Sequence, residues 1–225
     1  MNYLYILSED DNDDTFYQNC LARITEKSYE VIPQRLRKGG GISEVKRKLP
    51  LFLRQIKNTG KVENTFFIVS LDNDRSPIHP DHPKRPDLSK LTKADANKSC
   101  RFCDIEQAIE LALGSCTEEW PIPGAIAIPV EMIESWQLLI CNPDQYTSEQ
   151  GLPIFPDKRG AAAKHYYKSS NVPDQLKDLK RREQERLKLP SSKAFCIYCA
   201  EKLDTKALME KSPSFAQLVE QVNKW

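Results

Sequence analysis

Short apolar runs alternate along the chain with longer segments in which apolar residues recur every three or four positions. The first pattern is typical of β-strands and the second of amphipathic helices. The clearest strand is 64–71 (NTFFIVSL), a continuous β-prone run of the kind found in central strands buried on both faces. The other predicted strands are 3–7, 29–36 and 124–130. Helices are predicted after the first strand, over 42–58, 103–113 and 174–188, and from about 131 onward, with one helix or a helix pair over 205–222.

Strands that alternate with helices in this way predict an α/β fold, with a mostly parallel sheet and helices on both faces. We expect a single domain over 1–225, interrupted by two insertions at about 75–103 and 142–204. Each insertion contains or ends in a pair of cysteines. Pro50 lies inside one predicted helix, so that helix should be kinked or split in two.

Acidic residues directly follow three of the predicted strands. Glu9 follows the first strand, Asp72 and Asp74 the third, and Glu131 with Glu134 the fourth. Ligands of parallel α/β sheets bind at the carboxyl ends of the strands, so these carboxylates should converge there. Several ionised carboxylates need a compensating cation, and Mg²⁺ prefers oxygen ligands at roughly 2.0–2.1 Å. The alternative is that the acids cap the following helices, but three clusters at equivalent strand ends favour a metal site.

The same acidic segments resemble a known fold. The segments SEDDND at 8–13, DND at 72–74 and PVEMIESW at 129–136, in this order, resemble the TOPRIM fold. More narrowly, the chain looks like the small TOPRIM-like proteins encoded beside AAA/ABC-type ATPases in bacterial defence loci, relatives of the nuclease half of OLD-family proteins. The segments RLRKGGG at 35–41 and KSPSF at 211–215 are also similar to that group.

The resemblance implies a metal-dependent phosphodiesterase. Glu9 would be the general acid/base or the first metal ligand, Asp72 and Asp74 would be metal ligands, and Glu131 with Glu134 would complete a second position for Mg²⁺ or Mn²⁺. Two ions about 3.5–4 Å apart would clamp the attacking and leaving oxygens of a phosphodiester.

The implied function is that of a nuclease subunit in an anti-phage defence system. A separate ATPase would have to be its partner, because the chain has no GxxxxGK[ST] phosphate-binding loop. The alternative with the same fold is a non-catalytic effector or adaptor that binds the ATPase. A topoisomerase or primase fragment ranks below both, since the chain has no room for the additional domains of those enzymes.

Two cysteine pairs share one spacing. Cys100 and Cys103 form one C-x-x-C pair, and Cys196 and Cys199 form the other. Two such pairs can close a tetrahedral structural Zn²⁺ site with Zn–S distances of about 2.3 Å, which would join the two insertions. The alternative is that the four thiols pack as small apolar groups. A thioredoxin-like redox role is disfavoured, because neither pair follows a predicted strand and opens a βαβ unit.

Basic residues are densest between 158 and 188. Arg159 and Lys164 are the candidates for contacts with a nucleic-acid backbone, and neighbouring tyrosines would stack on bases. Interleaved acids in 174–185 instead favour a salt-bridged, solvent-exposed helix for the later part of this stretch.

The composition limits the class of protein and its expected location in the cell. A chain of 225 residues with 40% apolar and 29% charged residues suits one globular domain. A net charge of +1 means that any affinity for nucleic acid comes from local patches. No apolar run is long enough to span a membrane, and the N-terminus lacks the basic flank of a signal peptide. Together with seven cysteines, this predicts a reducing cytoplasmic location and no membrane partner.

Overall fold

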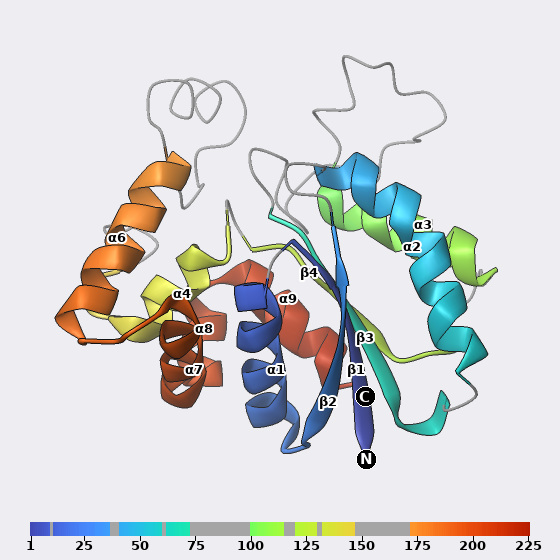
Figure 1. The fold of residues 1–225 in the computed structure, drawn as a ribbon, viewed down its shortest axis with the longest axis horizontal. Coiled ribbons are helices and arrows are strands. Elements are labelled where there is room, and N and C mark those ends of the chain that lie inside the picture. Colours follow the sequence, from blue (N-terminus) through green and yellow to red (C-terminus); the bar gives the residue numbers. More distant parts are fainter. Residues whose placement is uncertain are drawn as a thin grey trace.

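A four-stranded parallel sheet forms the centre of the molecule (Figure 1). The computed structural model describes residues 1–9, 11–36, 41–59, 62–72, 100–114, 120–129, 132–146 and 172–225. The strand order is β2-β1-β3-β4, with β1 at Asn2–Ser8, β2 at Tyr29–Arg35, β3 at Thr65–Ser70 and β4 at Gly124–Ala127. The predicted α/β class with a parallel sheet is therefore confirmed.

The register of the strands brings their carboxyl ends to one edge of the sheet. Leu7 of β1 is paired with Gln34 of β2 on one side and with Val69 of β3 on the other. Val69 is in turn paired with Ile126 of β4. All four strands run the same way, and we call the edge at which they end the carboxyl edge.

Helices cover both faces of the sheet (Figure 1). The helices α2 (Gly41–Asn58) and α3 (Arg101–Leu113) pack on one face. The other face carries α1 (Asp11–Thr25), α4 (Glu134–Cys141), α7 (Ser192–Lys202), α8 (Thr205–Lys211) and α9 (Pro213–Val222), with α6 (Val172–Arg186) packed against α4. A short 3-10 helix, η1 (Val62–Asn64), precedes β3. Among the described residues, no helix combines the length and apolar character needed to cross a bilayer.

Alternate residues of the strands supply the two cores. Leu4 and Ile6 of β1 belong to the cluster under α1 and α7, while Tyr5 and Leu7 belong to the cluster under α2 and α3. This follows from the two-residue period of a strand, which sends successive side chains to opposite faces. Each face of the sheet therefore has its own hydrophobic core.

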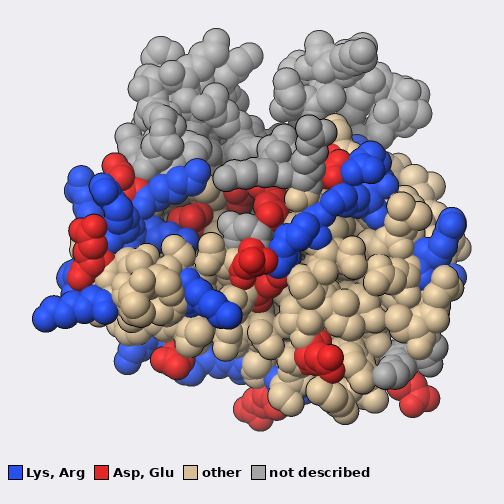
Figure 2. All heavy atoms as spheres, in the orientation of Figure 1, with Lys and Arg blue, Asp and Glu red and all other residues tan. Residues whose placement is uncertain are grey.

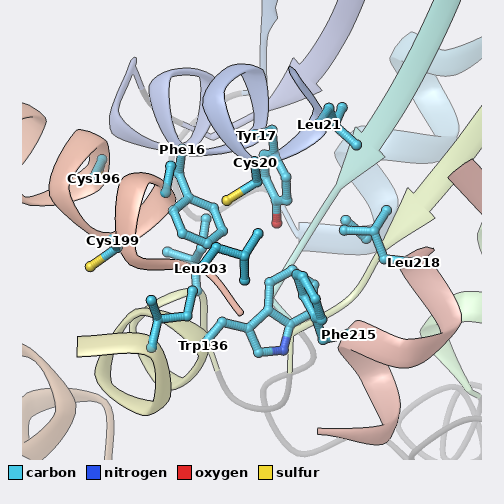
Figure 3. Close-up of a cluster of buried hydrophobic side chains, with 14 of the residues drawn as sticks. Phe16, Tyr17, Cys20, Leu21, Trp136, Cys196, Cys199, Leu203, Phe215 and Leu218 are labelled. Atoms are coloured by element: carbon cyan, nitrogen blue, oxygen red, sulfur yellow. The ribbon is translucent and has the colours of Figure 1, made fainter. Parts of the chain in front are cut away.

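Three aromatic side chains meet in the core on the α1 side (Figure 3). Tyr17, Trp136 and Phe215 are fully buried and meet edge to face, with ring centroids 6.3 Å apart for Tyr17–Trp136 and 5.3 Å for Trp136–Phe215. The indole Nε1 of Trp136 donates a hydrogen bond of 3.1 Å to Ser214 Oγ, which satisfies the one polar atom of that side chain. These contacts tie α1, α4 and α9 together.

The structure decides between the predicted alternatives in two segments and adds a helix to a third. Pro50 does not divide its helix, since α2 continues from Gly41 to Asn58. Residues 205–222 form the helix pair rather than the single helix, because Ser212 ends α8 and accepts a hydrogen bond from the N–H of Phe215 to cap α9. The expected insertion at 142–204 contains α6 and α7, and α7 packs directly on α1 through Phe195.

Candidate functional site at the carboxyl edge

Glu9 and Asp72 follow neighbouring strands. Leu7 pairs with Val69 next to the ends of β1 and β3, so Glu9 is the first residue after β1 and Asp72 the second residue after β3 at the carboxyl edge. Asp74 and Glu131 lie outside the described residues. In the view of Figure 2, acidic side chains gather in the upper middle of the described surface, with lysine and arginine side chains on either side.

A third acid lies near the same edge. Asp13 is in the first turn of α1, the helix that follows Glu9. Burial raises the pKa of Tyr17 well above its usual value, and the negative charges of Asp13 and Asp72 raise it further. The hydroxyl of Tyr17 also accepts a hydrogen bond of 2.8 Å from Ser70 Oγ at the end of β3. Both carboxylates therefore act on one buried hydroxyl group beneath the edge.

Arg35 neutralises two other acids of α1. Its guanidinium group forms ion pairs with Asp11 and Asp14 and donates a hydrogen bond of 3.3 Å to Ser8 Oγ. Ser8 Oγ in turn donates to Asp14 Oδ1 at 2.6 Å. This network fixes the start of α1 to the ends of β1 and β2, so Asp11 and Asp14 have a structural explanation.

Glu134 is paired with a lysine that the sequence did not single out as a site residue. Its carboxylate lies 3.2 Å from Lys180 Nζ on α6, and both side chains are about nine-tenths buried. Burial raises the pKa of Cys196 to about 11. The charge of Lys180 lowers this pKa, and the charges of Asp13 and Glu134 raise it, so these three charged groups lie near Cys196. In this arrangement Glu134 is therefore the ion-pair partner of Lys180.

The described donors fit a hard cation in chemical type. Glu9 and Asp72 offer carboxylate oxygens, which Mg²⁺ and Mn²⁺ prefer over nitrogen or sulfur. Among the described residues, no three His, Cys, Asp or Glu side chains are grouped closely enough to hold a metal ion together. Of the five predicted Mg²⁺ ligands, the structure thus brings Glu9 and Asp72 to one edge and gives Glu134 a lysine partner.

The two cysteine pairs lie on opposite faces of the sheet, which corrects the predicted zinc site. Cys100 and Cys103 belong to the core under α2 and α3, whereas Cys196 and Cys199 belong to the core under α1 and α4 (Figure 3). Cys196 Sγ accepts a hydrogen bond of 3.3 Å from the side chain of Gln137. With the sheet between the pairs, four thiolates cannot share one ion. The C-x-x-C spacing is compatible with one turn of a helix in both pairs. It does not predict on which face of the sheet that turn packs.

The predicted nucleic-acid contacts, Arg159 and Lys164, lie outside the described residues. A scan against protein-family models, a search of curated proteins and a search of solved structures found no significant match to this chain. Function is therefore inferred from the residues of the chain and their arrangement.

Proposed function

We propose that the protein is a cytoplasmic phosphodiesterase of the TOPRIM type that depends on Mg²⁺ or Mn²⁺. It would serve as the nuclease subunit of an anti-phage defence system, with a separate ATPase as its partner. One observation supports the catalytic part: Glu9 and Asp72 follow adjacent parallel strands that end at the same edge. The partner and the biological setting rest on the sequence resemblance alone.

The residues of the edge would have separate roles. Glu9 and Asp72 would hold the divalent cation, which supplies Lewis-acid stabilisation of charge on the phosphoryl oxygens. Arg35 holds Asp14 and Ser8, and thereby fixes the segment between β1 and α1 in which Glu9 lies. Tyr17 stays neutral because burial raises its pKa, so it adds no charge beneath the carboxylates.

A specific observation favours the second candidate, a non-catalytic adaptor. Lys180 neutralises Glu134, and Arg35 neutralises Asp14. Acids that are balanced by protein cations need no metal ion. An adaptor would keep the fold and the ATPase-binding surface, and it would not hydrolyse nucleic acid.

The experiment replaces Asp72 with Asn and Glu9 with Gln in the full chain. Labelled single- and double-stranded DNA and RNA are offered with Mg²⁺ or Mn²⁺, and Mn²⁺ binding is measured separately by electron paramagnetic resonance. We expect each variant to lose about 100-fold or more in hydrolysis, because a lost metal ligand removes several kcal/mol of transition-state stabilisation. Binding of Mn²⁺ should weaken in parallel.

The matched control is Asp178→Asn, which removes the same charge from an exposed acid on α6 that pairs with Arg181 at 3.1 Å. It should leave hydrolysis and Mn²⁺ binding unchanged. Metal-dependent hydrolysis that survives in both edge variants would contradict the proposal. Mn²⁺ binding that is lost in Asp72→Asn, with no hydrolysis of any substrate by the unmodified protein, would favour the adaptor.

A further inference from the structure

The first cysteine pair opens a helix next to the carboxyl edge. Cys100 is the N-cap of α3, and Cys103 lies in the first turn of that helix. The N–H of Asp104 donates a hydrogen bond of 3.0 Å to the carbonyl oxygen of Cys100, which closes the turn between the two cysteines. In chain order α3 lies between the parallel strands β3 and β4, so this pair does open the helix of a βαβ unit. The part of the sequence-based objection that concerned the βαβ unit therefore does not hold for this pair, although Cys100 does not directly follow the end of β3 at Ser70.

The surroundings of Cys100 favour its thiolate. A hydrogen bond from the Cys103 thiol is the main cause that lowers the pKa of Cys100, and the N–H groups of Cys103 and Phe102 act in the same direction. Burial and the charge of Asp104 oppose this shift without reversing it. Hydrogen-bond donors at a helix N-terminus stabilise a thiolate for the same reason that they stabilise other anions.

The second pair has the same spacing and the opposite chemistry. Cys196 and Cys199 lie inside α7 and are fully buried in the core under α1. Burial raises the pKa of Cys196 to about 11 and raises that of Cys199 well above its usual value. Both thiols therefore stay protonated at neutral pH. This pair can serve as an internal control for the reactivity of Cys100 and Cys103.

We propose that Cys100 and Cys103 form a redox-active dithiol that hydrogen peroxide converts reversibly into a disulfide. The two residues are only 2% and 5% exposed, which favours an oxidant as small as a peroxide over a bulky disulfide. Neighbours in a closed first helical turn lie within the Cα separation that a disulfide spans, roughly 4.4–6.8 Å. All six described cysteines are free thiols.

The reaction has two balanced steps. The Cys100 thiolate attacks one oxygen of the peroxide, the O–O bond breaks, and a sulfenic acid and hydroxide form. The Cys103 sulfur then attacks the Cys100 sulfur, the S–S bond forms, and the sulfenic hydroxyl leaves as water with the proton of Cys103. The hydroxide of the first step takes up the proton that Cys100 released on ionisation, so two thiols and one hydrogen peroxide give one disulfide and two water molecules. Thiol reductants such as dithiothreitol reverse the product by exchange.

The pair lies beside the candidate metal site. Arg101, between the two cysteines, donates a hydrogen bond to the carbonyl oxygen of Asp72. The inference does not depend on the proposed nuclease activity, because disulfide formation can be measured directly on the full chain.

The test treats the reduced, folded protein with one equivalent of hydrogen peroxide and then alkylates the remaining thiols. Trypsin and a glutamate-specific protease cut after Lys98, Arg101 and Glu106, so the disulfide would join peptides 99–101 and 102–106. Mass spectrometry should detect this linked pair, and dithiothreitol should separate it. Cys196 and Cys199 should remain thiols that react only after denaturation.

Two matched variants sharpen the test. Cys100→Ser should slow the loss of thiols to peroxide about 100-fold or more, because the most ionised thiol is removed. Cys196→Ser should change that rate less than about twofold. The proposal is overturned if Cys100 and Cys103 both remain alkylatable after peroxide treatment of the folded, unmodified protein. It is equally overturned if one Zn²⁺ per chain copurifies with the pair and its thiols react only after chelation.

Discussion

Single acids at the carboxyl edge differ in how their charge is balanced. Asp14 lies against Arg35, and Glu134 lies against Lys180. In both pairs the carboxylate is buried, and a buried charge without a partner is costly. These cations therefore account for the two acids structurally. At Asp72, the carbonyl oxygen accepts a hydrogen bond from Arg101.

The buried pair on α4 and α6 gives a prediction for Lys180→Met. This substitution keeps the aliphatic stem and leaves the carboxylate of Glu134 buried without its lysine. We expect the free energy of unfolding at pH 7 to fall by about 3 kcal/mol, because breaking one side of a buried ion pair is strongly destabilising. Urea unfolding monitored by circular dichroism measures the change.

The controls separate a structural pair from a metal ligand. Adding Glu134→Gln to Lys180→Met should restore most of the loss, and Arg181→Met at the exposed pair with Asp178 should stay within about 0.5 kcal/mol of the unmodified protein. A loss in Lys180→Met that Mg²⁺ reverses would instead identify Glu134 as a metal ligand.

At the scale of helices and strands, the local sequence pattern was sufficient to predict an element whose residues all have the same environment. The run 64–71 contains β3, whose residues are all buried, and a continuous apolar run is the signature of that environment. The helix α7 was missed. Its buried residues include Cys196, Cys199 and Ala200, which are small and give a weak apolar stripe.

Only the part of the candidate site that lies at strand ends could be predicted from the sequence. A parallel sheet brings Glu9 and Asp72 to one edge, and the sequence gives enough to predict both strands. The contact of Glu134 with Lys180 joins α4 to α6. The two residues are 46 positions apart in the sequence. Spacing along the chain carries no information about such a contact, and it carries none about which face each cysteine pair packs on.

The pairing of β3 with β4 gives a prediction for Gly124→Ala. A Cβ at position 124 would overlap the ring of Phe67, which is fully buried and packs against Trp120 and Phe52. We expect unfolding to require about 2 kcal/mol less free energy, as in other overpacked cores. Urea unfolding provides the measurement. Adding Phe67→Leu should relieve the overlap, so simple additivity of the two single changes would contradict this explanation.

The whole molecule places helix N-termini and acids at the same edge. The helices α1, α2 and α3 each connect two parallel strands of the sheet, so each begins near the carboxyl edge. A helix N-terminus carries a partial positive charge, which offsets part of the negative charge of the nearby carboxylates. The edge is thus suited to an anionic substrate together with a cation, and both cores of the sheet hold it in position.

The distribution of thiols between the two cores predicts how the stability of the molecule depends on alkaline pH. Burial raises the pKa of Cys20, Cys196 and Cys199 above their values in an unfolded chain. Between about pH 8.5 and pH 11 the unfolded chain therefore releases thiol protons that the folded protein keeps. Stability is fully present below that range and falls as the pH rises through it. The pKa of Cys100 is lowered, which acts in the opposite direction for that one thiol.

We therefore expect the free energy of unfolding in urea to fall between pH 8 and pH 10, by about 2 kcal/mol for each of these three thiols. Cys20→Ala removes one of them and should make the pH dependence shallower by a similar amount, whatever its effect on stability at pH 7. Cys100→Ser should not make it shallower. A free energy of unfolding that stays constant over this range would mean that the three thiols ionise as readily in the folded core as in water, which their burial does not allow.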